Sequence, residues 1–87
     1  MDFGSVIKLL NCGHKCARTG WNGKGMFIFL VDGSTFGVSR PPLDKFYKPG
    51  TEINYRAHID MSHANGDIGV WNPTNNDILA EDWFIVD

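Results

Sequence analysis

The sequence predicts a single α+β domain spanning residues 1–87, in which an N-terminal helix packs on a small, mainly antiparallel sheet. Three observations favour this class. Apolar residues follow helical spacing near the N-terminus, several short strand-like segments fill the rest of the chain, and 87 residues leave room for one core. The 43% hydrophobic and 21% charged residues are typical of a globular protein.

The first predicted element is a helix over residues 3–11. Asp2 is a suitable N-cap, and Gly13 suits the left-handed residue that often follows a helix. The helical period places four apolar side chains on one face, and we expect that face to be buried: Phe3, Val6, Ile7 and Leu10.

Strands are expected next, on either side of a glycine-rich loop. Residues 15–19 form a possible strand, and residues 20–25 hold three glycines and must turn sharply. Residues 26–31 are continuously apolar, which predicts a buried strand at the centre of the sheet.

The middle of the chain combines breakers with one clear alternation. Prolines and glycines predict a long excursion without regular structure over residues 34–50, which could belong to a functional loop. Residues 53–61 alternate apolar and polar, as a strand with one wet face does. The Asn65–Gly66 pair predicts a hairpin turn that leads into a partner strand over residues 67–71.

A short late helix and a final strand complete the prediction. Candidate caps at 73–77 precede Ile78, Leu79 and Ala80, and residues 83–86 form the last strand. A core of this size gives little net stability without disulfides or metal, and copies of such a chain often share apolar surface. We therefore expect a homo-oligomer.

Charge and hydropathy exclude several classes. The formal net charge is −2 with no run of like charges, so we expect no DNA partner. No apolar stretch approaches about 20 residues and the N-terminus lacks a signal segment, so we expect no membrane association. Cys12 and Cys16 are too few for a disulfide framework, which fits a reducing cytoplasm.

No metal, cofactor or catalytic set is expected either. Cys12, His14 and Cys16 resemble zinc ligands, but His58 and His63 would lie on opposite faces of a regular strand and cannot complete the site. The two cysteines are instead expected to act as small buried residues near the helix end. Walker, nucleophile-elbow and dinucleotide motifs are missing.

The tryptophans and a few cations are the best candidates for a binding site. Trp21 and Trp71 could stack on a purine, or each could fill the small core, while Trp83 is expected to be structural. Three cationic side chains in glycine- and proline-rich segments could bind a pyrophosphate: Arg18, Lys24 and Arg40. Taken singly, each is better explained as a solvated surface charge.

Three segments carry a resemblance to a known family: residues 17–26 (ARTGWNGKGM), 58–61 (HIDM) and 79–83 (LAEDW). With these segments the chain resembles the Thoeris anti-defence 2 family of short phage-encoded domains. The resemblance implies a sponge that binds the glyco-cyclic ADP-ribose messenger of bacterial Thoeris immunity without cleaving it. It also implies cyclic dinucleotides or trinucleotides as further ligands, and a homotetramer with interface pockets in the host cytoplasm.

On this hypothesis the two tryptophans flank the base and nearby polar groups meet phosphate, ribose or the rim. The predicted ligand-binding set is Arg18, Trp21, Asn22, Gly23, Lys24, Trp71, Thr74 and Asp77. Two alternatives stay open. One is a small hydrolase of nucleotide signals that uses Asp60 or Asp77, and the other is a module that binds a host protein through residues 34–50.

Overall fold

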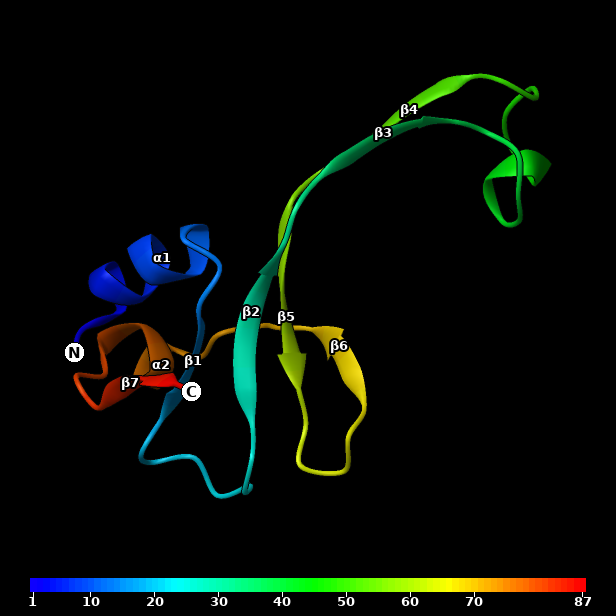
Figure 1. The fold of residues 1–87 in the computed structure, drawn as a ribbon. Helices are drawn as coiled ribbons and strands as arrows, with labels where there is room; N and C mark the ends of the chain where they lie inside the picture. The colour runs from blue at the N-terminus through cyan, green and yellow to red at the C-terminus, as the bar shows by residue number, and fades with distance from the viewer.

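The computed structural model describes residues 1–87 as a body with a projecting arm (Figure 1). The body is a five-stranded antiparallel sheet in the order β6-β5-β2-β1-β7, with two helices. This confirms the predicted α+β class. The body elements are α1 (Phe3–Asn11), β1 (Lys15–Arg18), β2 (Phe27–Val31), β5 (His58–Ser62), β6 (Ile68–Val70), α2 (Asn75–Leu79) and β7 (Trp83–Val86).

Helix α1 begins and ends where its local sequence predicts. The side chain of Asp2 accepts a hydrogen bond from the Ser5 amide at 2.9 Å, and Gly13 has a φ of 89°. Val6 and Leu10 are buried and Phe3 packs against the core. Ile7 was expected on this buried face, but its side chain is 37% exposed because it lies at the margin of the apolar stripe.

One core lies between α1 and the facing side of the sheet. Alternate strand residues supply it, as the period of a strand requires. The prediction that Trp83 is structural is confirmed. The buried cluster consists of Val6, Leu10, Cys16, Ile28, Met61, Trp71 and Trp83.

Two predictions about burial were wrong. Strand β2 is central as expected, but Phe27 and Phe29 are only half-buried because α1 covers just one side of the sheet. Cys16 is buried as expected, whereas Cys12 is exposed because it caps the end of α1 beyond the stripe that faces the core.

The arm is a two-stranded ribbon, β3 (Ser34–Gly37) with β4 (Glu52–Tyr55), and carries a short 3₁₀ helix, η1 (Leu43–Lys45), at its tip (Figure 1). The prediction that residues 34–50 lack regular structure was therefore wrong. The prolines lie only at the tip, beyond β3. Because the arm projects, the radius of gyration is 16.0 Å, whereas a compact chain of this length has about 12 Å.

The arm continues the central strands of the body without a change of register. Val31 faces His58 in the body and Ser34 faces Tyr55 in the arm, so two residues on each side join the ladders in step. The strand predicted over residues 53–61 is thus divided between β4 and β5, which belong to different sheets. Its apolar residue Tyr55 is exposed because the arm has left the core.

The later turn and caps agree with prediction. Gly66 has a φ of 92° in the turn between β5 and β6. Helix α2 begins with a capping box, in which the Thr74 side chain accepts from the Asp77 amide and the Asp77 side chain accepts from the Thr74 amide. No helix in the structure is long and apolar enough to cross a membrane.

Candidate functional site

A cavity of about 330 Å³ lies beside the end of β6 and the first turn of α2. It brings together one aromatic wall, one carboxylate and two further polar side chains. Trp71 and Asp77 belong to the predicted ligand-binding set. The lining residues are Met61, His63, Val70, Trp71, Asn72 and Asp77.

The Asp77 carboxylate is the centre of a hydrogen-bond network. Its Oδ1 accepts from Arg18 Nη1 at 2.7 Å and from Trp21 Nε1 at 3.1 Å. Its Oδ2 accepts from the Thr74 amide at 3.0 Å. Four residues of the predicted set, Arg18, Trp21, Thr74 and Asp77, therefore meet in one place.

Arg18 bridges two carboxylates. Its Nε donates to Asp82 Oδ1 at 2.8 Å, while Asp82 Oδ2 accepts from the Gly20 amide at 2.8 Å. Hydrogen bonds to Asp82 and then to Asp77 raise the pKa of Arg18. The guanidinium therefore ties β1 to α2 and to the residue before β7, while Asp82 also holds Gly20 at the start of the glycine-rich loop. Only the other N–H groups of Arg18 remain for a ligand.

Asp77 is ionised in this network. Burial alone would raise its pKa, but the hydrogen bonds from Thr74, Arg18 and Trp21 outweigh burial and lower it. The hydrogen bond from Arg18 likewise lowers the pKa of Asp82, ahead of the opposing effect of burial. The carboxylate at the cavity wall is therefore an acceptor at neutral pH.

Trp21, Trp71 and Trp83 form a ladder of edge-to-face contacts. Trp83 lies in the middle, 5.2 Å from the ring centroid of Trp21 and 5.9 Å from that of Trp71. Its Nε1 donates to the Asp77 carbonyl oxygen at 2.9 Å. Trp71 is 9% exposed, so it fills the core, and its remaining surface lines the cavity wall. Stacking of Trp71 on a purine stays a prediction.

The glycine-rich loop lies against the turn between β5 and β6. At Gly23 an added Cβ would approach the Cβ of Ala64 to 3.0 Å, and Ala64 follows the cavity residue His63. Asn22 and Lys24 are exposed, and no side-chain hydrogen bond or salt bridge engages them. The predicted residues Asn22, Gly23 and Lys24 thus lie on the neighbouring loop and not in the cavity wall.

Two polar cavity residues, His63 and Asn72, are outside the predicted set, as are the apolar residues Met61 and Val70. His63 directly follows β5, and Asn72 lies two residues after the end of β6. Because β5 and β6 are antiparallel, their ends lie at opposite edges of the hairpin, so the sequence offered no signal that these two residues share a cavity.

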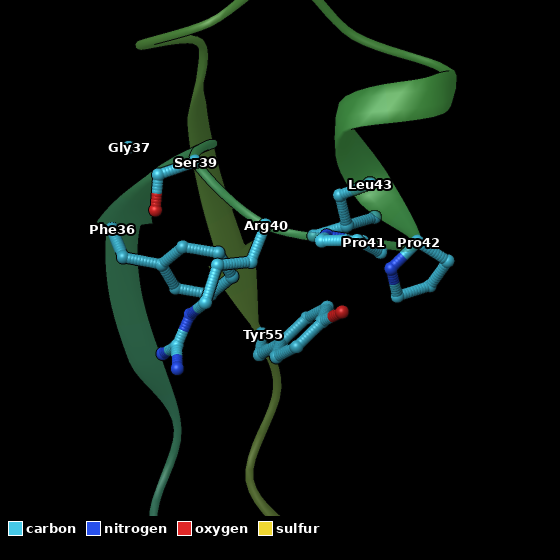
Figure 2. A pocket seen from close by; sticks show the side chains of 8 residues that line it. All are labelled: Phe36, Gly37, Ser39, Arg40, Pro41, Pro42, Leu43 and Tyr55. Atoms are coloured by element: carbon cyan, nitrogen blue, oxygen red, sulfur yellow. The ribbon is translucent and has the colours of Figure 1, made fainter.

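Arg40 does not line this cavity, because it belongs to the arm. There it lines a separate hollow of about 350 Å³, beside the rings of Phe36 and Tyr55 and opposite the two prolines (Figure 2). The phenylalanine and tyrosine rings meet edge to face at 5.2 Å. The structure therefore does not bring Arg40 together with Arg18 and Lys24 within one chain. It contains no group of three or more His, Cys, Asp or Glu side chains that could hold a metal ion.

Comparison with known proteins identifies the family of the chain. The model of the Thoeris anti-defense 2-like domain matches residues 1–86. A curated relative, Thoeris anti-defense 2 from Bacillus phage SP01, is 36% identical over 89 residues, covering 99% of this chain and 94% of the relative. On this evidence the chain belongs to the Thoeris anti-defense 2 family.

Proposed function

We propose that the protein binds and sequesters a cyclic ADP-ribose-type immune messenger and does not cleave it. One observation carries the proposal: Trp71 and Asp77 share a cavity wall, and Trp21 is hydrogen-bonded to the same carboxylate. Membership of the family supports a phage anti-defence role. The site of action is then the host cytoplasm, where such a messenger is made.

The wall and its neighbours suit a nucleotide. An indole offers a flat surface for a purine, worth about 1 to 3 kcal/mol per stacked base. Asp77 and Asn72 can accept hydrogen bonds from base or ribose, and the unpaired Lys24 can meet a phosphate from the adjoining loop. Each group therefore has a distinct role in one binding mode.

One chain encloses only part of such a ligand. The cavity lies near the lower end of the roughly 300 to 1,000 Å³ range of ligand pockets, and the messenger has about 35 heavy atoms. At about −0.3 kcal/mol per atom, a well-buried ligand would bind with about −10 kcal/mol, equivalent to tens of nanomolar. We therefore propose that a second copy of the chain completes the pocket, as in the homotetramer that the resemblance implies.

The state of Asp77 supports binding without cleavage. A general acid needs a raised pKa, whereas hydrogen bonds lower the pKa of this carboxylate below its ordinary value. Three donors already occupy it, which makes it a poor base as well. Asp77 is therefore suited neither to the general-acid nor to the general-base role that the hydrolase alternative would give it.

The first test is calorimetric titration with glyco-cyclic ADP-ribose, followed by heat denaturation and chromatography of the released ligand. We expect a dissociation constant below about 1 μM and chemically intact ligand. An altered product would establish the hydrolase instead. An absence of heat with this messenger and with cyclic dinucleotides and trinucleotides would reject the sponge.

Matched substitutions locate the site. Trp21→Ala and Asn72→Ala are expected to weaken binding about 10- to 100-fold and about 10-fold, respectively, because they remove a stacking or hydrogen-bonding group. Asn11→Ala, at the exposed end of α1, is the control for Asn72→Ala. Thermal unfolding of every variant is measured alongside, and equal affinity of the Asn72 and Asn11 variants would contradict the placement.

A further inference from the structure

The hollow near the tip of the arm is lined by arm residues alone. Its volume is about 350 Å³, and it shares no lining residue with the Trp71–Asp77 cavity of the body. Aromatic and proline rings form its walls, and one cation and two hydroxyl groups line it as well (Figure 2). We call it the arm hollow, and its principal residues are Phe36, Ser39, Arg40, Pro41, Pro42 and Tyr55.

The backbone around the arm hollow is fixed by hydrogen bonds within the arm. The Val38 amide donates to the Thr51 carbonyl oxygen at 2.9 Å, and the Gly50 amide donates to the Val38 carbonyl oxygen at 2.9 Å. The Arg40 carbonyl oxygen accepts from the Asp44 amide at 3.2 Å. The hollow therefore exists without a ligand, which lowers the entropic cost of binding one.

Two aromatic rings present flat surfaces to the arm hollow. Phe36 faces Ile53 and Ser34 faces Tyr55, so the two rings are diagonal neighbours on one side of the ribbon. They meet edge to face with their centroids 5.2 Å apart, and this contact orients both. Tyr55 nevertheless stays 51% exposed. The walls therefore suit a planar ring, which stacks well on such surfaces.

Arg40 is a cation without a partner in the chain. Its guanidinium makes no hydrogen bond or salt bridge, whereas that of Arg18 bridges two carboxylates. No carboxylate lines the arm hollow. Residues 38–50 carry three cations and one carboxylate, although the whole chain has a net charge of −2. Because a guanidinium binds a carboxylate or phosphate through two parallel hydrogen bonds, the hollow favours one of these anions.

We propose that the arm hollow is a second ligand site, which takes a small molecule whose planar aromatic ring carries one carboxylate or phosphate group. The ring lies against Phe36 and Tyr55, and the anionic group binds Arg40. The hydroxyl groups of Ser39 and Tyr55 have no partner in the chain, so polar substituents of the ring can bind them. The volume lies near the lower end of the roughly 300 to 1,000 Å³ range of ligand pockets, which limits the ligand to about one ring system.

This site goes beyond the proposed function and does not depend on it. The arm hollow and the Trp71–Asp77 cavity belong to different sheets and have no residue in common. Binding at each is therefore measured by the resonances of its own lining residues. Loss of messenger binding would leave the arm site standing, and an empty arm hollow would leave the sponge standing.

Three small probes test whether the ring and the anion are recognised together. Phenyl phosphate carries both, whereas inorganic phosphate and benzyl alcohol carry one each. In a titration followed by amide NMR, phenyl phosphate should shift Gly37, Ser39 and Tyr55 with a dissociation constant of about 1 mM or tighter. We expect each control to bind at least about 10-fold more weakly. Equal binding of inorganic phosphate would show only an anion at an arginine, and that result or shifts confined to the body would overturn the proposal.

Two further probes distinguish the sources of this ligand chemistry. Adenosine monophosphate carries the ring and the phosphate of a nucleotide, and benzoate carries those of an aromatic acid. Each is added to the complex with phenyl phosphate, and displacement is followed at the same amides. Stronger displacement by adenosine monophosphate assigns the site to nucleotides, and stronger displacement by benzoate assigns it to aromatic acids. Failure of both to displace phenyl phosphate would overturn the proposal.

Substitutions of two arginines locate the anion. Arg40→Gln removes the cation of the arm hollow, and Arg56→Gln, at an exposed position at the root of the arm, is the matched control. Because the Arg40 side chain has no partner in the chain, its replacement should leave the arm folded, with the Val38 amide as protected as in the wild type. We expect Arg40→Gln to weaken binding of phenyl phosphate at least about 10-fold and Arg56→Gln less than about 2-fold. Arg40→Lys should lie between them, because it keeps the charge but not the paired N–H groups. Equal affinities of the two glutamine variants would overturn the proposal.

Discussion

Nine of the ten buried residues lie in the body, whereas the arm buries only Val38. The body adds to its core a network of carboxylates and donors that ties β1, α2 and β7 together. The arm relies on the pairing of β3 with β4 and on local contacts, such as the Thr35–Asn54 side-chain hydrogen bond of 2.6 Å. Cross-strand contacts of this kind contribute only about 0.2 to 1 kcal/mol each, and an isolated hairpin is marginal in water.

The difference implies that the two regions unfold separately. The body is cooperative because its network joins segments distant in sequence, and removing one member exposes several unmet partners. The arm has few such links to the body, so it can open while the body stays folded. A substitution that destabilises one region should therefore leave the stability of the other unchanged, and this separation can be tested.

Asp77→Ala is expected to have the largest effect, a loss of about 3 kcal/mol in the free energy of unfolding. It removes the acceptor of Arg18 Nη1 and Trp21 Nε1 and half of the capping box of α2. Urea denaturation should show a lower midpoint with an unchanged slope. Glu52→Ala in β4, an exposed position without a salt bridge, is the control and should change stability by less than about 0.5 kcal/mol. Equal effects would mean that the network is dispensable.

Acid should weaken the body through the same carboxylates. The folded-state pKa values of Asp77 and Asp82 are below the ordinary 3.8, so both groups stabilise the fold fully above that pH. This contribution is lost as pH falls below about 3.8 and through the folded-state values. Urea midpoints measured between pH 6 and 3 should fall less for Asp77→Asn than for the wild type, because one linked carboxylate is gone. Parallel curves would show that Asp77 is not linked to folding.

The sequence predicted features that depend on neighbouring residues and missed features that depend on long-range contacts. The caps of α1 and α2 and the Asn65–Gly66 turn depend on neighbouring residues, and all three are confirmed. Strand β3 was missed because its pairing with β4 spans the proline-rich tip and leaves no periodic signal. A strand was wrongly extended through residues 53–61 because alternation continues where the ribbon leaves the core.

The site shows the same division. Half of the predicted set meets at Asp77, but sequence could not reveal that Arg18 is held by carboxylates 59 and 64 residues away. His63 and Asn72 enter one cavity through the tertiary fold, His63 from the turn after β5 and Asn72 from the segment between β6 and α2. Residue type suggested a ligand site, and tertiary contacts decided which side chains remain free for it.

Gly33→Ala is expected to have the smallest effect on global stability and a clear local one. At the root of the arm, an added Cβ would lie 2.7 Å from the Tyr55 carbonyl oxygen, closer than real Cβ atoms approach backbone. The ribbon must shift there, at a cost of roughly 1 to 3 kcal/mol that falls on the arm.

Hydrogen exchange distinguishes local opening from global unfolding. The Val38 amide, which donates to the Thr51 carbonyl at 2.9 Å, should exchange at least about 10-fold faster in Gly33→Ala, because opening of the arm exposes it. Amides of β1 and β2 should keep their wild-type rates. Gly69→Ala is the matched control, since an added Cβ at Gly69 meets nothing within 4 Å. If exchange rose equally in the arm and in β2, the two regions would form one cooperative unit. The arm and the body would then unfold together although few contacts join them.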